Sequence, residues 1–174
     1  MAVWPFQRSR ARKDAERLLG AVTLISRQPA FFGEGRAADT LEGRFEVMAL
    51  HGALALIRLR ADPGLEPLAQ EFTDAMFSQF DAGLREASVG DMAVPRRMRR
   101  LASAFYGRLE VYGGALDAAD SATLTDALSR NLLKDEASRF AAVLADYAKR
   151  TVEHQANLPV DALFRLDGWA PAPA

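Results

Sequence analysis

Apolar residues nearly encircle one twenty-residue segment of the chain, and this feature constrains the fold more than any other. The segment spans residues 41–60 and carries large apolar side chains at Phe45, Val47, Met48, Leu50, Leu54, Leu56, Ile57 and Leu59. A helix that is apolar on all sides has to be buried, because none of its faces suits water. Asp39 and Thr40 are favourable N-cap residues, and the Asp-Pro-Gly sequence at residues 62–64 breaks the chain. The sequence therefore predicts a central, buried helix over residues 41–60.

Helical spacing of apolar residues predicts further helices around this one. Their expected ranges are 8–28, 65–84, 95–116, 120–133 and 135–157. Alternating strand patterns of useful length and repeats of 20 to 50 residues are missing, and a chain of 174 residues fits one domain. The predicted fold is all-α, a single compact domain of about six helices over residues 14–158. A basic and aromatic arm, residues 1–13, precedes it, and residues 159–174 form a C-terminal segment with a frayed tail.

Residue counts exclude several classes of enzyme. The chain has no cysteine, which removes disulfides, thiolate catalysis, zinc–cysteine sites and iron–sulfur ligation. It has two histidines, too few in suitable positions for a di-iron bundle, a Ser-His-Asp triad or most zinc hydrolase sites, and it has no Gly-rich phosphate loop. We interpret His51 as a core histidine with a hydrogen-bonded ring, and the Glu42–Glu46 pair as a solvated face. The sequence predicts a protein that is not an enzyme, with no cofactor and no metal.

Charges are segregated along the chain although the formal net charge is only −1. Residues 61–91 hold seven acidic side chains and one basic, whereas residues 92–108 hold five arginines and no acid. Such local patterning favours recognition of a partner, while the balanced total argues against wholesale binding of nucleic acid or acidic membranes.

The sequence VPRRMRRLASAFYGR, residues 94–108, places these arginines on a predicted helix. At 100° per residue the apolar side chains form one stripe: Met98, Leu101, Phe105, Leu109, Tyr112 and Leu116. Arg96, Arg100, Ser103, Gly107 and Gly114 lie on the opposite side, with Arg99 beside them. The predicted partner-binding residues are Arg85, Asp91, Arg96, Arg99, Arg100, Ser103, Tyr106, Gly107 and Arg108. A solvated face and an RNA- or ribosome-binding module are the alternatives.

The N-terminus combines interfacial aromatics with bases. Trp4, Phe6, Arg8, Arg10, Arg12 and Lys13 are the candidate membrane-surface residues. The alternative is that the aromatics fold back onto the core. No apolar run approaches the roughly 20 residues of a membrane span, and the start lacks the apolar core of a secretory signal. We therefore expect residue 1 to begin the mature protein.

Several blocks of the sequence resemble the ubiquinol–cytochrome c chaperone family. The most specific is LREASVGDMAVPRRMRR, residues 84–100, followed by FYGR at residues 105–108. QPAFF at residues 28–32, DTLEGRFE at 39–46, LH at 50–51, RLR at 58–60 and ALSRN at 127–131 match further blocks in order. Phe32 stands where the family usually has tyrosine, Ala87-Ser88 replaces a common Met-Gly, and Pro95 a glycine or lysine. The resemblance covers about residues 15–150.

This resemblance implies an all-helical, non-enzymatic assembly factor for the respiratory cytochrome bc1 complex. The implied client is newly made cytochrome b or another bc1 subunit, and the implied helpers are the ribosome or a small partner protein, with no specific DNA. A bacterial member would act in the cytoplasm, with peripheral contact at the inner membrane. The competing hypotheses are the RNA- or ribosome-binding module and a haem-related helical protein that uses His51.

Overall fold

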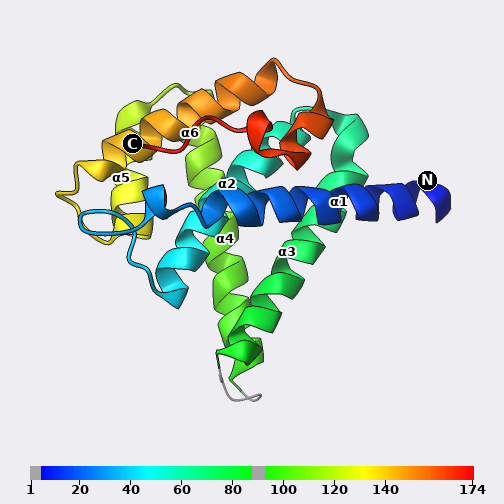
Figure 1. The fold of residues 1–174 in the computed structure, drawn as a ribbon, viewed down its shortest axis with the longest axis horizontal. Coiled ribbons are helices and arrows are strands. Elements are labelled where there is room, and N and C mark those ends of the chain that lie inside the picture. The colour runs from blue at the N-terminus through cyan, green and yellow to red at the C-terminus, as the bar shows by residue number, and fades with distance from the viewer. Residues whose placement is uncertain (1–4, 88–92) are drawn as a thin grey trace.

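Helix α2, Leu41–Arg60, lies at the centre of the computed structural model and begins and ends where the sequence predicts (Figure 1). The structure describes residues 5–87 and 93–174. The Thr40 hydroxyl caps the helix by accepting a hydrogen bond from the Gly43 amide over 3.1 Å. Thirteen residues of α2 are buried, on all sides of the helix. The predicted all-α fold is confirmed by the described residues.

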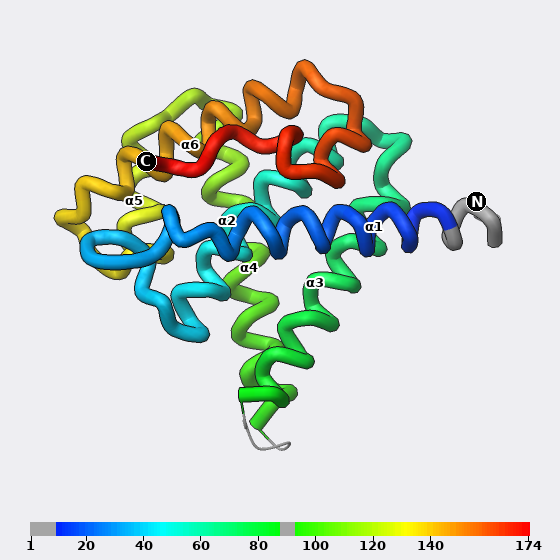
Figure 2. The backbone as a smooth tube through the Cα atoms, in the orientation of Figure 1, coloured from blue at the N-terminus to red at the C-terminus, as the bar shows by residue number. Residues whose placement is uncertain are grey.

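Within residues 5–87 and 93–174, five more α-helices and five short helical turns surround α2. The α-helices are α1 (Pro5–Ser26), α3 (Glu66–Glu86), α4 (Val94–Asp117), α5 (Ser121–Leu128) and α6 (Phe140–Ala156). The short turns are η1 (Pro29–Phe31), η2 (Pro63–Leu65), η3 (Ser129–Leu133), η4 (Val160–Phe164) and η5 (Leu166–Gly168). Helices α3 and α4 run side by side as an antiparallel hairpin that projects from the body of the molecule (Figures 1 and 2). This hairpin carries the arginine-rich segment.

His51 is a core residue, as predicted, and its hydrogen bonds define its tautomer. The ring is fully buried, with Nδ1 2.7 Å from the Val47 carbonyl oxygen and Nε2 2.9 Å from the Tyr147 hydroxyl. Because a carbonyl can only accept, Nδ1 carries the hydrogen and Nε2 accepts from Tyr147. Burial lowers the pKa of His51 to about 4, so the ring is neutral at physiological pH. Both ring nitrogens therefore have partners inside the protein.

The segment from residue 120 to residue 157 departs from the predicted pair of helices. Helix α5 ends at Leu128 and continues as the π-helical stretch η3, which Lys134 closes with a left-handed backbone at φ 54°. Helix α6 begins at Phe140 rather than at residue 135. The Asp135 carboxylate accepts from the Ala137 amide, so a local turn replaces the expected first helical turn.

The prediction of a frayed C-terminal tail is wrong. Trp169 is only 3% exposed, and its indole nitrogen donates to the Leu163 carbonyl over 3.2 Å. At the end of the segment, Arg36 donates to the backbone oxygen of Ala174. A buried indole contributes a large apolar area and a satisfied donor, which holds the segment on the body of the domain (Figure 1).

Candidate functional site

The first two turns of α4 concentrate exposed positive charge. Arg96, Arg97, Arg99 and Arg100 are all exposed, and the first turn contains no acidic residue. The N-terminal end of a helix already carries a partial positive charge, so arginines there disfavour the helix by a few tenths of a kcal/mol each. The stability of the fold alone therefore does not account for this cluster.

The structure distributes the predicted partner-binding residues over different surroundings. Ser103 and Gly107 are exposed on α4, and Tyr106 is 46% exposed with its ring 5.9 Å from that of Phe77. Arg85 is exposed on α3 and forms an ion pair with Asp81 over 2.7 Å. Asp91 lies outside the described residues. We call the exposed residues Arg96, Arg99, Arg100, Ser103 and Gly107 of α4 the arginine face.

Arg108 differs from the rest of the predicted set because it belongs to the interior. Its guanidinium holds the Glu46 carboxylate with two hydrogen bonds, Nε to Oε2 at 2.5 Å and Nη2 to Oε1 at 2.6 Å. The two side chains are 14% and 8% exposed. Burial raises the pKa of the Glu46 carboxyl, and the pairing with Arg108 opposes that rise. The prediction that Glu46 lies on a solvated face is therefore wrong, and Arg108 joins α4 to α2.

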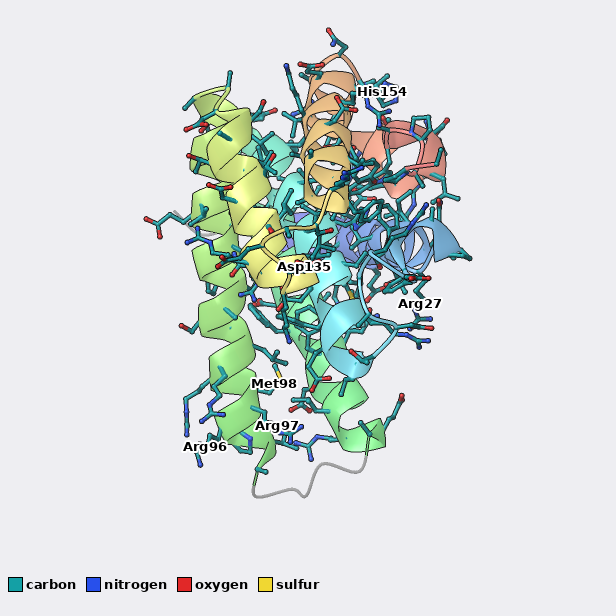
Figure 3. The ribbon with its side chains drawn as sticks, turned by 90° about the vertical axis from the view of Figure 1, so that its left-hand side faces the viewer. Arg27, Arg96, Arg97, Met98, Asp135 and His154 are labelled. Carbon is teal, nitrogen blue, oxygen red and sulfur yellow. The ribbon has the colours of Figure 1, made fainter. Side chains whose placement is uncertain are left out.

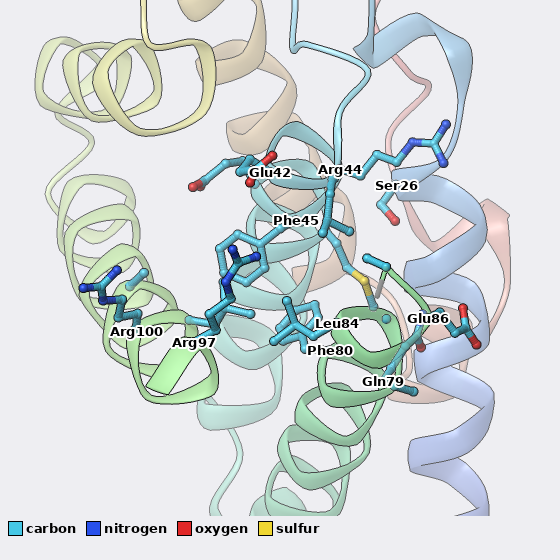
Figure 4. Close-up of a pocket in the computed structure, with 18 of the residues that line it drawn as sticks. Ser26, Glu42, Arg44, Phe45, Gln79, Phe80, Leu84, Glu86, Arg97 and Arg100 are labelled. Atoms are coloured by element: carbon cyan, nitrogen blue, oxygen red, sulfur yellow. The ribbon is translucent and has the colours of Figure 1, made fainter. Parts of the chain in front are cut away.

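A groove of about 950 Å³ lies between the start of α2, the end of α3 and the start of α4 (Figure 4). Its floor is apolar, and it consists of Phe45, Met48, Phe80, Leu84, Leu101 and Ala104. The rings of Phe45 and Phe80 meet edge to face, with their centroids 5.0 Å apart. The end of α1, through Ser26 and Arg27, and Lys134 after η3 complete the walls.

Charged side chains surround this apolar floor. Arg97 and Arg100 from α4, Arg27 and Lys134 supply cations, and Glu42 and Glu86 supply anions. Arg44 also lines the groove, but it pairs with Asp39 over 2.6 Å. Figure 4 shows Arg97 on the α4 side of the groove and Glu86 on the α3 side. The groove is therefore apolar at its base and mainly cationic at its rim.

Arg97 is a groove residue that the sequence prediction left out, although its position on α4 contained the signal. Residues 97, 101, 104 and 108 follow helical spacing and share one side of the helix, next to the core stripe. Arg96 instead faces the outer side of α4, and Figure 3 shows the two arginines on different sides of the helix. The arginine cluster thus divides between the groove and the outer surface, with Arg100 belonging to both.

The candidate membrane-surface residues are only partly within the described side chains. Trp4 lies outside the described residues, and the side chains of Phe6 and Arg8 are not among those described. Arg10, Arg12 and Lys13 are exposed on α1, where Arg10 pairs with Asp14 over 3.8 Å and Arg12 with Glu16 over 3.3 Å. Among the helices of residues 5–87 and 93–174, none has the length and apolar character to cross a membrane.

Comparison with known proteins finds a protein family that matches this sequence and a solved structure with a similar fold. The ubiquinol–cytochrome c chaperone family matches the chain over residues 34–167. The crystal structure of the Cbp3 homolog from Brucella abortus superposes with a TM-score of 0.79 at 36% sequence identity. That match covers 92% of this chain and 91% of the other. A search of curated proteins finds no match.

Proposed function

The chain belongs to the ubiquinol–cytochrome c chaperone family, and from this membership we propose that it assists assembly of the respiratory cytochrome bc1 complex by binding newly made cytochrome b. The protein acts by binding and catalyses no reaction. The observation that carries this proposal is the family match over residues 34–167, which includes the arginine face and most of the groove.

The chemistry of the exposed surface supports a binding role. Arg96, Arg99 and Arg100 present guanidinium groups, which donate hydrogen bonds in a fixed planar arrangement to carboxylates and carbonyl oxygens. An assembly factor needs to hold its client reversibly, and exposed charge gives fast, salt-sensitive association. The arginine face therefore binds an acidic or carbonyl-rich segment of the client, and Arg85 and Asp91 remain further predicted contacts.

We further propose that the protein acts in the cytoplasm, with peripheral contact at the inner membrane. Arg10, Arg12 and Lys13 lie on one end of α1, where anionic lipid could attract each base by about 1 kcal/mol. Flotation with liposomes that contain anionic lipid tests this contact. We expect the full chain to float and a variant lacking residues 1–13 to stay in the dense fraction, and equal flotation of both would contradict membrane contact.

Co-purification with pulse-labelled cytochrome b tests the client directly. A variant with Arg96→Glu and Arg100→Glu should keep its helical circular dichroism and its melting temperature, because both side chains are exposed. It should lose the labelled cytochrome b. A matched control with Arg130→Glu and Arg139→Glu makes the same change of charge at exposed positions elsewhere. Equal recovery of cytochrome b with all three proteins would contradict the proposal.

The four exposed arginines also favour a second candidate function, the binding of RNA or the ribosome. RNA binding by arginines releases counterions, so its affinity should fall steeply as salt concentration rises. Ribosome sedimentation at two salt concentrations, with the arginine-face variant and its control, measures this. If the protein binds RNA or ribosomes and recovers no bc1 subunit, the RNA-binding function would replace the proposed role in bc1 assembly.

A further inference from the structure

The groove has a floor that cannot form hydrogen bonds with a peptide backbone. The side chains of Phe45, Phe80, Leu84 and Leu101 offer no strong donor or acceptor. A segment that lies on such a floor must satisfy its own backbone amides and carbonyls, because leaving them unpaired away from water costs free energy. An α-helix meets this requirement and an extended strand does not.

The surrounding helices offer a suitable shape for one more helix. The end of α3, the start of α4 and the start of α2 line the groove, with the end of α1 and Lys134 at its edges (Figure 4). Leu41 stands at the rim with 43% of its surface exposed. Amphipathic helices bind such grooves by placing apolar side chains at positions i, i+3, i+4 and i+7.

The charges at the rim favour a bound helix with acidic residues beside its apolar stripe. Within residues 5–87 and 93–174, no ion pair joins the groove cations Arg27, Arg97, Arg100 and Lys134 to an acidic side chain within 4 Å. The acidic side chains that line the groove are Glu42, Glu86 and Glu46, and Glu46 pairs with Arg108 while the charge of Lys134 also acts on it. An occupant with carboxylates beside its apolar stripe would complement the excess positive charge.

We propose that this groove binds an amphipathic helix of the client whose apolar stripe is flanked by aspartate or glutamate. This inference rests on the proposed function only in naming the client as the source of the helix. Arg97 and Arg100 pair with the acidic flank, and Phe45, Phe80, Leu84 and Leu101 receive the apolar stripe.

Gly83 provides a way to fill the groove without disturbing the fold. It lies within helix α3, it lines the groove, and a Cβ added there would meet no atom within 4 Å. Gly83→Trp therefore adds an indole at a position that lines the groove, and circular dichroism with thermal melting checks that the variant is folded. Gly20, within α1, also has open space around an added Cβ and does not line the groove. Gly20→Trp is the matched control, and Arg97→Glu with Arg100→Glu is a second groove variant.

The probe is a labelled helical peptide of about 14 residues with leucines at i, i+3, i+4 and i+7 and flanking glutamates. A second peptide carries lysines in place of the glutamates. Fluorescence anisotropy should detect binding of the glutamate peptide to the wild-type chain and to Gly20→Trp. Its affinity should fall at least about tenfold in both groove variants, and the lysine peptide should bind at least about tenfold more weakly. Equal binding of the two peptides, or undiminished binding to folded Gly83→Trp, would overturn the inference.

Co-purification of pulse-labelled cytochrome b separates this inference from the proposed function. If both hold, Gly83→Trp should lose cytochrome b and Gly20→Trp should retain it. Retention of cytochrome b by folded Gly83→Trp would overturn the groove inference and leave the proposed function intact. Binding of the glutamate peptide in the groove, without any recovery of bc1 subunits by the wild-type chain, would support the groove and contradict the proposed function.

Discussion

The surroundings of His51 determine its protonation state more clearly than those of any other residue discussed above. Its ring is neutral in the fold, with Nδ1 donating to Val47 and Nε2 accepting from Tyr147. Protonating Nε2 would remove an acceptor and place a charge in the core. In the unfolded chain the imidazole is in water and can be charged without this free-energy cost, so it protonates near the ordinary pKa of 6.5. Protons therefore favour the unfolded state at acidic pH.

The predicted consequence is a pH-dependent contribution to stability from His51. Between pH 6.5 and about 4 the unfolded chain binds a proton that the folded chain excludes, so stability falls as the pH falls. This contribution reaches at most about 1.4 kcal/mol per pH unit, roughly 3 kcal/mol in total. Urea unfolding of the wild type and His51→Gln at several pH values measures it. The stability difference between them should narrow across this window, and a constant difference would refute the assignment.

The Glu46–Arg108 pair leads to a second prediction at the residue scale. Arg108→Met should lower the free energy of unfolding by about 3 kcal/mol at pH 7, because it leaves a nearly buried carboxylate without its cation. The loss should shrink at pH 5, since burial raises the pKa of Glu46 and a protonated carboxyl tolerates the site better. Urea unfolding gives both values. Glu46→Leu combined with Arg108→Met should recover much of the loss, and a double variant less stable than Arg108→Met would count against a pair mechanism.

The same pair shows what sequence reasoning could and could not predict for single residues. The arginine cluster, the exposed Gly107 and the buried His51 follow from helical spacing alone. The positions of Arg97 and Arg108 also have a signal in that spacing, because both lie beside the core stripe of α4. Their roles depend on the residues that face that side, namely Phe45 and Glu46 of α2. The apolar pattern of one helix does not reveal which residues of another helix pack against it.

Elements with strong local signals are those that the sequence predicts best. Helix α2 starts at the Thr40 cap and ends just before the Asp-Pro-Gly break, so its bounds follow from local chemistry. Helix α5 lacks such a stop signal at Leu128, where it continues directly as the π-helical η3. The groove likewise needs four elements from different parts of the chain, which no local pattern reveals.

Gly107 provides a prediction for the exposed side of α4. A Cβ at this position would meet no atom within 4 Å, so Gly107→Ala should stabilise the isolated domain by up to about 1 kcal/mol through helix propensity. If the client packs closely on the arginine face, Gly107→Ala and more strongly Gly107→Leu should weaken co-purification of cytochrome b. Melting temperature and co-purification measured on the same preparations check both effects. Unchanged co-purification in both variants would remove Gly107 from the contact surface.

At the scale of the whole molecule, contacts between distant segments complete the domain. Trp169 reaches the core from a segment rich in alanine and proline, a composition that by itself indicates a loose tail. The α3–α4 hairpin projects from this body (Figure 2), and the first two turns of α4 carry the exposed arginines Arg96, Arg97, Arg99 and Arg100. The body thus supplies stability, and the arginine face and the groove beside it are the proposed binding surface.

The bc1 content of membranes from a strain that lacks this chain tests the central claim most directly. Haem difference spectra and ubiquinol–cytochrome c reductase activity are measured in the deletion strain and after return of the wild-type gene. We predict that most of the haem b of the bc1 complex and its reductase activity disappear and that the wild-type gene restores both. Wild-type levels of assembled, active bc1 complex in the deletion strain would contradict the account.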